Sequence, residues 1–228
     1  MTDSLLIRDS DRHRLLSALN VETDNLPRDA IAALEALAGE VLHLRAQNQT
    51  LMKDFEEASD LADKDALCPV FNRRAFMREL TREIASAERY NTALSLIYID
   101  LDRFKLVNDR FGHATGDKVL KLVSSIILDN IRQTDIPARL GGDEFAVLLT
   151  HAEHRHAQDK AHVLEREIQS LIVRDSQSDT SSKVQVGASC GTVTWKRGLS
   201  AQALLDIADE RMFLAKAETK RDKQVRQT

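Results

Sequence analysis

Cysteine is scarce in this chain of 228 residues, and long apolar runs are missing. Cys68 and Cys190 lie far apart and form no Cys-x-x-Cys motif, so the sequence indicates neither a zinc site nor a disulfide framework. No apolar run approaches the roughly 18 residues of a membrane span, and the first residues lack the basic start and apolar core of a signal peptide. We therefore expect a cytoplasmic protein without a membrane span.

An excess of positive charge is also absent. The 32 lysine and arginine residues are outnumbered by 36 acidic residues, which gives a net charge of −4 with both signs interspersed. Such a chain offers no electrostatic basis for binding nucleic acid or an anionic membrane. Its length leaves room for one sizeable domain and an accessory segment.

The most informative segment is Gly-Gly-Asp-Glu at 141–144, followed by Phe145. It lies between apolar stretches at 136–140 and 146–149, a pattern that predicts a β-hairpin with carboxylates near its tip. Glycine adopts positive φ without steric cost and lets the backbone approach a ligand closely, which suits a phosphate and its metal ion. A hairpin turn with solvated acids is the simpler interpretation when this motif is taken alone.

A second pair of carboxylates follows an apolar segment upstream. Residues 93–100 are expected to form a buried strand that ends at Asp100, with Asp102 beyond it. If this strand is a neighbour of the hairpin, Asp100 and Asp143 converge. Converging carboxylates repel unless a cation lies between them, and hard oxygen ligands with spare positions for phosphate oxygens suit Mg²⁺. The two segments together therefore predict nucleotide chemistry.

Helical and strand patterns alternate through the C-terminal part of the chain, which is typical of an α/β or α+β domain. The helices are expected at 72–90, near Phe104, and at 116–131, 157–173 and 201–219, and the strands at 93–100, in the hairpin and at 184–190.

Upstream of this domain, apolar residues recur at alternating steps of three and four, which is the pattern of a coiled coil. Leu37, Leu44 and Leu51 occupy d positions, a distribution that favours two parallel strands. Asn48 falls at an a position, where pairing with its counterpart in a second copy fixes register and strand number. The seam runs through Leu34, Leu37, Val41, Leu44, Asn48, Leu51, Phe55, Ala58 and Ala62.

The coiled-coil interpretation has one alternative, an amphipathic helix packed on its own globular domain. The apolar stripe is narrower than such a helix usually shows. Pro27 marks the expected helix start, and residues 5–19 are expected to form a shorter helix that folds back on the first. We therefore expect a helical dimerisation segment at 1–64 and a separate domain at 65–228.

Several separated motifs, in this order and spacing, resemble the GGDEF-domain diguanylate cyclases. They are Asp-Leu-Asp-Arg-Phe-Lys-Leu-Val-Asn-Asp-Arg-Phe-Gly-His-Ala-Thr-Gly-Asp at 100–117, Arg-Gln-Thr-Asp at 132–135 and Gly-Gly-Asp-Glu-Phe at 141–145. The resemblance spans the chain from about Asp65 onward and implies a central sheet of the nucleotidyl-cyclase and polymerase-palm kind, flanked by helices. It further implies a homodimeric enzyme that condenses two GTP into cyclic di-GMP and releases two pyrophosphates.

The resemblance implies a role for each matched acidic position. Asp100, Asp143 and the backbone carbonyl of Leu101 would hold two Mg²⁺ ions at the triphosphate, with Mn²⁺ as a substitute. Asp143 is the first candidate to assist deprotonation of the attacking 3′-hydroxyl. Glu144 would either share that role or orient the metal shell, and the sequence does not decide between them.

Substrate contacts are implied in the segment that follows. Asn108 and Asp117 offer the amide and the carboxylate that the edges of guanine require, with His113 nearby. Without the motif, Asp117 would be interpreted as a helix N-cap and Asn108 as a turn former. Phe104 is also expected at the substrate, and Lys105 in the loop after the strand would offset charge on the α-phosphate.

Two lysines near the C-terminus are expected at the terminal phosphates. The family shows Ala-Lys, two residues, then Gly-Arg-Asn, whereas this chain has Lys216 at the lysine, Thr219 at the glycine and Lys220 at the arginine position. Lysine lacks the bidentate fork of arginine, so phosphate binding is expected to be weaker unless Arg221 substitutes after an early helix end. Stabilisation of a helix C-terminus is the alternative role of Lys220.

Arg132 and Asp135 match the product-inhibition site of the family, where cyclic di-GMP would bind. An i,i+3 salt bridge is the alternative. Downstream, His151, His154 and His156 lack acidic or cysteine ligands at suitable spacing and are expected to be solvated rather than to bind a metal.

One departure from the family pattern lies at the entry to the domain. After Asp65 the family usually shows Leu-Thr-Gly-Leu, whereas this chain has Leu-Cys-Pro-Val at 67–70. Pro69 supplies neither a backbone donor nor a positive φ, so the turn is expected to differ locally.

Two alternatives to an active cyclase remain open. One is a catalytically inactive module that binds GTP or cyclic di-GMP as a signalling receptor, which the lysine at position 220 favours and the intact acidic positions oppose. The other is a nucleotidyl cyclase that makes a cyclic mononucleotide. Formation of cyclic di-GMP from GTP and Mg²⁺ distinguishes an active cyclase from the receptor, and the mass of the product would reveal a cyclic mononucleotide.

Overall fold

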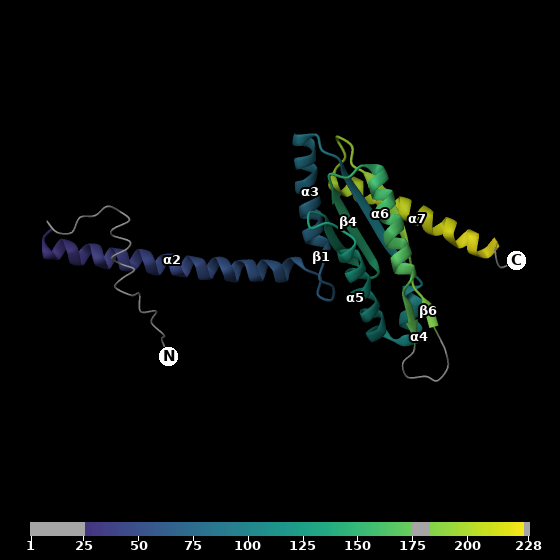
Figure 1. Ribbon diagram of the computed structural model, residues 1–228, viewed down its shortest axis with the longest axis horizontal. Coiled ribbons are helices and arrows are strands. Elements are labelled where there is room, and N and C mark those ends of the chain that lie inside the picture. Colours follow the sequence, from purple (N-terminus) through teal and green to yellow (C-terminus); the bar gives the residue numbers. More distant parts are fainter. Residues whose placement is uncertain (1–25, 175–182, 226–228) are drawn as a thin grey trace. The chain divides into compact units, whose positions relative to one another are not determined.

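The computed structural model describes residues 26–174 and 183–225 (Figure 1). The chain divides into two compact units, residues 1–62 and 63–228. The short helix expected at 5–19 lies outside the described residues. In the described parts of the chain, no helix combines the length and the apolar character needed to cross a membrane.

The first unit is dominated by the long helix α2, Arg28–Asp63. The amides of Ala30 and Ile31 donate to the Pro27 carbonyl at 2.9 and 3.1 Å, so the helix begins directly after the proline, as predicted. The leucines of the expected seam are exposed to solvent in the single chain, with exposed fractions of 62% for Leu37, 53% for Leu44 and 67% for Leu51. Their pairing with a second copy stays a prediction.

The second unit is built on a five-stranded sheet in the order β1-β3-β4-β2-β7. β1 pairs in parallel with β3, and the other neighbours are antiparallel. The strands are β1 Phe71–Asn72, β2 Leu94–Asp102, β3 Ile136–Gly141, β4 Glu144–Thr150 and β7 Gly187–Thr194, and the helices are α3 Arg73–Tyr90, α4 Phe104–Phe111, α5 His113–Asp129, α6 His154–Gln169 and α7 Ala201–Val225.

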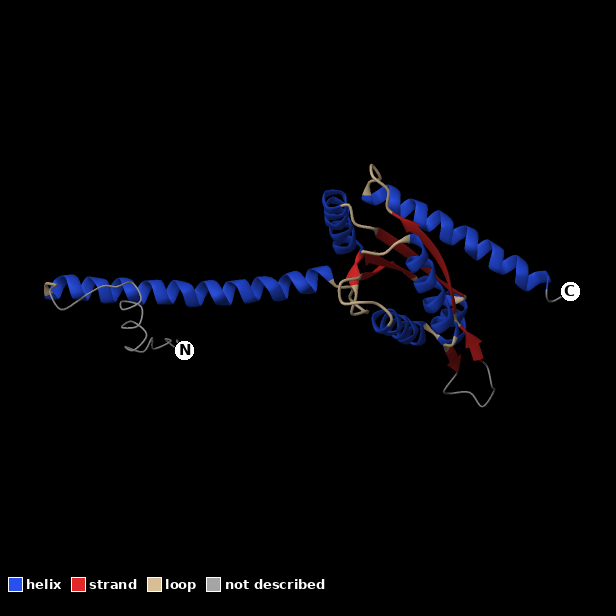
Figure 2. Ribbon diagram, turned by 45° about the horizontal axis from the view of Figure 1, so that its top comes forward, coloured by secondary structure: helices blue, strands red, loops and turns tan. Residues whose placement is uncertain are grey.

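Helices cover both faces of this sheet (Figure 2). Alternate residues of β2 enter different cores: Leu96 and Tyr98 pack with α3 and α7, whereas Ile97 and Ile99 pack with α5 and α6. A central strand that is buried on both faces needs apolar side chains at nearly every position, which explains its unbroken apolar sequence. The expected α/β class with a helix-flanked central sheet is confirmed.

Several sequence-based boundaries were wrong, and two of them lie between α6 and β7. The helix expected to reach 173 ends at Gln169, and β5, Ile172–Arg174, pairs instead with β6, Lys183–Gln185, in a separate two-stranded sheet. The amide of Ser170 donates to carbonyls of the last helical turn and so caps the helix. The β-branched residues Ile172 and Val173, which follow, adopt the extended conformation of a strand. The single strand expected at 184–190 is likewise divided at Val186 into β6 and β7.

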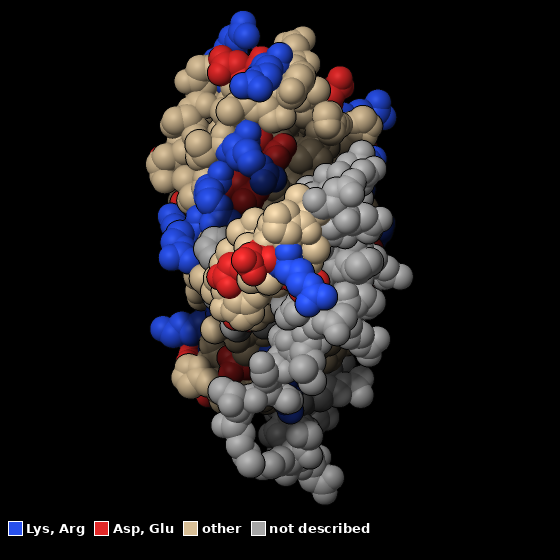
Figure 3. All heavy atoms as spheres, turned by 90° about the vertical axis from the view of Figure 1, so that its left-hand side faces the viewer, with Lys and Arg blue, Asp and Glu red and all other residues tan. Residues whose placement is uncertain are grey.

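The surface drawn in Figure 3 carries basic and acidic side chains side by side, in line with the mixed charge of the sequence.

Candidate active site

The hairpin and the buried strand are neighbours, so their acidic ends meet. β2 and β4 run antiparallel with Asp100 opposite Glu144, and the strand continues through Asp102 rather than ending at Asp100. At the hairpin tip, the amide of Leu101 donates to the backbone carbonyl of Asp143 at 3.2 Å. The register therefore brings Asp143 beside the end of β2.

The carboxylate of Asp100 is close enough to Asp143 to influence the ionisation of Asp143. Burial raises the pKa of the Asp143 carboxyl, and the negative charge of Asp100 raises it further. Lys216 of α7 lies against the pair, because its ammonium group donates to Oδ1 of Asp100. Two repelling carboxylates with one partial counter-charge form a place where a cation is stabilised.

The donor set fits a divalent metal ion that also binds a ligand. Carboxylate oxygens are the hard donors that Mg²⁺ prefers. Within residues 26–174 and 183–225, no group of three or more His, Cys, Asp or Glu side chains is arranged to hold a metal. A metal ion held by two carboxylates alone would keep coordination positions for phosphate oxygens.

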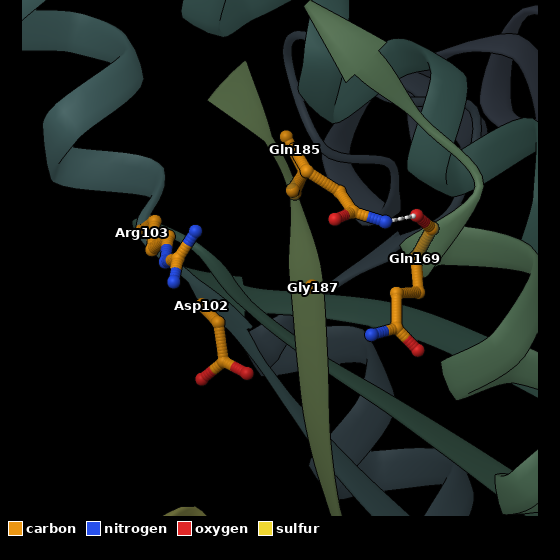
Figure 4. Close-up of a pocket in the computed structure, with 6 residues that line it drawn as sticks. Asp102, Arg103, Gln169, Gln185 and Gly187 are labelled. Atoms are coloured by element: carbon orange, nitrogen blue, oxygen red, sulfur yellow. Dashed lines mark hydrogen bonds between the residues drawn. The ribbon is translucent and has the colours of Figure 1, made fainter. Parts of the chain in front are cut away.

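The carboxylate of Asp102 is hydrogen-bonded to the neighbouring strand β7. The hydroxyl of Ser189 in β7 donates to its carboxylate at 3.1 and 3.3 Å. The carboxylate lines a small polar pocket beside Arg103, together with Gln185, whose side chain donates to the Gln169 carbonyl at 2.7 Å (Figure 4).

Glu144 lies near a buried phenol. Burial raises the pKa of Tyr98, and the negative charge of Glu144 raises it further. Glu144 and Asp143, adjacent in sequence, thus have different surroundings.

Asn108 does not form the turn that its residue type suggested. It lies in the second turn of α4, and its Oδ1 atom is buried without a hydrogen-bond partner. A Cβ atom at Gly116 would sit 1.9 Å from this oxygen and 3.2 Å from the Phe104 ring, so only glycine lets α5 approach so closely. A buried acceptor without a donor costs about 1–3 kcal/mol, which makes this atom a candidate for contact with a ligand.

The neighbouring polar residues differ from their sequence-based alternatives too. Asp117 is not an N-cap, because α5 begins at His113 with Gly112 at the cap and φ of 78°. Both Asp117 and His113 are exposed beside Gly116. Lys105 lies in the first turn of α4 rather than in a loop, and its side chain is exposed.

Phe104 begins α4 and is buried in the core, with only 8% of its surface exposed. Its ring therefore supports Asn108 and Gly116 from the side of the core.

The C-terminal phosphate contacts are only partly described. α7 continues to Val225, past the expected end at 219, so the early helix end that would bring Arg221 into the place of Lys220 does not occur. The side chains of Lys220 and Arg221 lie outside the described part of the helix.

The Arg132 and Asp135 pair is not an i,i+3 salt bridge. The Asp135 carboxylate is buried and accepts backbone amides of Arg132 at 2.9 Å and Thr150 at 3.3 Å, while the Arg132 side chain is exposed. A pocket beside them is also lined by His156 and Lys160. No local pattern predicts these two neighbours of Arg132, because they come from a helix farther along the chain.

The three histidines are exposed, as expected of solvated side chains. His151, in a left-handed conformation with φ of 51°, lines the same pocket as His156, whereas His154 begins α6.

Comparison with known proteins identifies the family. Residues 62–222 match the family model described as diguanylate cyclase, GGDEF domain. The chain is 34% identical over 169 residues to diguanylate cyclase DosC of Escherichia coli K12, covering 73% of this chain and 36% of DosC. It is 34% identical over 200 residues to diguanylate cyclase TpbB of Pseudomonas aeruginosa PAO1, covering 87% of this chain and 44% of TpbB.

A solved structure shares the fold. The coiled coil and GGDEF domain of DgcB from Caulobacter crescentus, in complex with c-di-GMP, superposes with a TM-score of 0.72 at 27% identity, covering 80% of this chain and 95% of that one. The chain spans less than half the length of the two curated relatives. The matched family model covers more than half of the chain, which therefore belongs to the diguanylate cyclase GGDEF-domain family.

Proposed function

We propose that this chain condenses two GTP into cyclic di-GMP and releases two pyrophosphates. The observation that carries the proposal is the meeting of Asp100 and Asp143 at the junction of β2 and the hairpin, with the pKa of Asp143 raised by burial and by Asp100. Family membership and the names of the curated relatives support the same reaction.

Divalent ions complete the proposed site, two Mg²⁺ per active site with Mn²⁺ as a substitute. Asp100, Asp143 and the Leu101 carbonyl are the residues that would hold them. When bound, such ions neutralise phosphate charge and favour ionisation of an attacking hydroxyl. Lys216, already at Asp100, would bring positive charge to the terminal phosphates. Lys105 would stabilise charge at the α-phosphate, and Lys220 would add a point charge farther along α7.

The surroundings of the two hairpin acids favour Asp143 as the proton acceptor. Asp143 belongs to the acidic pair that would hold the metal ions, beside which the attacking hydroxyl would bind, whereas Glu144 lies near the buried phenol of Tyr98. We infer that Glu144 orients the hairpin and that Asp143 takes the proton of the 3′-hydroxyl.

Guanine would be recognised between α4 and α5. The buried Oδ1 atom of Asn108 lacks a donor, and the exocyclic amine of guanine is a donor of suitable kind. The exposed carboxylate of Asp117 would accept from the same edge, with His113 at the rim. Phe104 would act from below by supporting Asn108.

Two chains would be needed for the reaction, since each would present one GTP. The exposed seam of α2, with Leu37, Leu44 and Leu51, favours a parallel coiled-coil homodimer that raises the effective concentration of one half-site near the other. We infer a dimerisation segment at 1–64 and a catalytic domain at 65–228.

Product inhibition is proposed at the pocket beside Asp135. Because backbone amides occupy the Asp135 carboxylate, the exposed guanidinium of Arg132 is the group that would grip a phosphate of cyclic di-GMP. We expect Arg132→Ala to raise the concentration of cyclic di-GMP that halves activity.

The deciding experiment is incubation of the purified chain with GTP and Mg²⁺, followed by mass analysis of the product. Asp143→Ala should abolish formation of cyclic di-GMP, whereas the control Asp109→Ala, at an exposed position of α4, should leave it intact. Binding of GTP or cyclic di-GMP without turnover would favour the receptor, which the lysine at position 220 supports. A product with the mass of a cyclic mononucleotide would refute the proposed reaction.

A further inference from the structure

The side chain of Arg139 in β3 joins two segments that are far apart in the sequence. Its Nε and Nη2 atoms donate to the backbone carbonyl of Gly142 at 3.0 and 2.7 Å. Its Nη1 atom donates to Oδ1 of Asp65 at 3.1 Å. The exposed fractions of the two side chains are 15% for Arg139 and 19% for Asp65, so water screens this ion pair only partly.

Asp65 is the acidic residue of the first turn after α2. Its Oδ1 atom also accepts the amides of Leu67 at 3.0 Å and Cys68 at 2.9 Å. Burial opposes ionisation of Asp65, but these amides and Arg139 outweigh it and lower the pKa of the carboxyl. The carboxylate thus remains charged and fixed.

The unusual Pro69 is compatible with this arrangement. The amide of Val70 donates to the Cys68 carbonyl at 2.8 Å, which closes a three-residue turn centred on Pro69. The ring of proline holds a φ that suits such a turn, and both amides that reach Asp65 precede the proline. The departure from the family pattern therefore leaves Asp65 with its donors.

The other end of the network lies at the hairpin tip. Gly142 has φ of 48°, and the β3–β4 register shifts between Arg139 and Gly141, so the backbone ladder alone constrains the tip weakly. Gly142 directly precedes Asp143, whose carbonyl accepts the Leu101 amide. Two donors from Arg139 hold the peptide unit that carries the candidate metal ligand.

We propose that Arg139 is a positioning residue for the hairpin acid Asp143, and that Asp65 orients its guanidinium, so that the turn following α2 sets the order of the catalytic hairpin. For catalysis the inference depends on the proposed function, but the order of the tip is independent of it. A signal that disturbs the turn after α2 would reach Asp143 through one guanidinium.

A neighbouring ion pair supplies the control. The carboxylate of Asp63, the last residue of α2, accepts hydrogen bonds from Nη1 and Nη2 of Arg78 in α3, at 3.1 and 2.7 Å. This pair also fastens the start of the unit, but it is directed to α3 and not to the hairpin. Asp63→Asn and Asp65→Asn therefore remove the same charge two residues apart, and only the second reaches Gly142.

The first test measures amide hydrogen exchange at the hairpin tip in the full chain, without nucleotide or metal. We expect Asp65→Asn and Arg139→Gln to accelerate exchange at 142–144 and at Leu101 by about tenfold or more, because a hydrogen bond to a charged group contributes at least that factor to an opening equilibrium. Asp63→Asn should leave these amides unchanged. The inference would be overturned if the amides at 142–144 and Leu101 exchanged at the same rate in Asp65→Asn as in the original chain. It would also be overturned if Asp63→Asn accelerated their exchange as much as Asp65→Asn does. Should Arg139→Gln fail to fold, Asp65→Asn alone decides.

The second test measures the dependence of turnover on Mg²⁺. Asp65→Asn should lower kcat by about tenfold and raise the Mg²⁺ concentration for half-maximal activity, while KM for GTP at saturating Mg²⁺ stays constant, because the nucleotide contacts of α4 and α5 are untouched. An increase in KM with unchanged kcat would contradict a role in positioning Asp143. Absence of activity in the original chain would refute the proposed function, and the exchange result would still decide whether Arg139 orders the tip.

Discussion

The buried, unpaired oxygen of Asn108 allows a prediction with opposite signs for stability and for binding. Asn108→Ala removes an acceptor that has no donor in the free chain. Relief of its desolvation is worth about 1–3 kcal/mol, and the cavity left behind offsets part of this gain. We therefore expect the free chain to keep its stability or to gain up to about 1 kcal/mol, which a denaturant titration measures.

Binding should change in the other direction. If Oδ1 accepts the exocyclic amine of guanine, its loss leaves that amine unpaired and weakens GTP binding by about 1–3 kcal/mol, or about 5- to 150-fold. The affinity is measured by calorimetry with a GTP analogue that cannot react, in the presence of Mg²⁺. A loss of affinity in a variant that is no less stable cannot be attributed to unfolding.

Inosine triphosphate, which lacks the exocyclic amine, isolates the contact. The original chain should prefer GTP over inosine triphosphate by a factor in the same range, and Asn108→Ala should reduce that preference toward one. Asp109→Ala, at the adjacent exposed position, is the control and should retain the preference. An undiminished preference in Asn108→Ala would refute the assignment of this oxygen to the guanine amine.

Three further predictions concern other parts of the molecule. Gly116→Ala places a Cβ atom 1.9 Å from Oδ1 of Asn108, so it should lower stability by about 1–3 kcal/mol in denaturant titration and also weaken GTP binding; retention of both would contradict the packing. Leu44→Glu should shift the chain toward monomers in light scattering and lower activity per chain, whereas Arg45→Glu should not; unchanged activity at nanomolar protein would contradict the dimer. Asp143→Asn should stabilise the metal-free chain at pH 7. Since the folded pKa of Asp143 is raised, wild-type stability is lost as the pH rises through that pKa, and the difference should vanish below about pH 4, the ordinary aspartate range.

The hairpin and the main helices follow from local patterns, because apolar periodicity and a Gly-Gly turn act over a few residues. The order of the strands does not follow from local patterns, because the parallel pairing of β1 with β3 joins Phe71 to Ala138, which are far apart in the sequence. β5 was missed for a related reason: Ile172 and Val173 continue a helical pattern, and only their partners in β6 make them a strand.

The candidate site was predictable in composition but not in geometry. The acidic pair follows from the ends of two strands, and its convergence required only that they be neighbours. The helical position of Asn108 was missed because asparagine favours turns, and its burial depends on the close approach of Gly116 from another helix. The capture of Asp135 by backbone amides likewise depends on β4, which no local pattern reveals.

Among the described residues, the buried side-chain polar atom that lacks a partner belongs to the proposed site, which is itself an argument for a ligand there. Other buried polar side chains have partners: Ser95 donates to the Ala152 carbonyl at 2.8 Å, and Asp135 accepts two amides. Over the described residues, Asn108 Oδ1 is the single buried side-chain oxygen or nitrogen without a partner. Loose packing would scatter such atoms through the core. An isolated orphan acceptor in α4 and an acidic pair in which Asp100 raises the pKa of Asp143 both support the proposal that a base donor and a cation-bound phosphate bind in this unit.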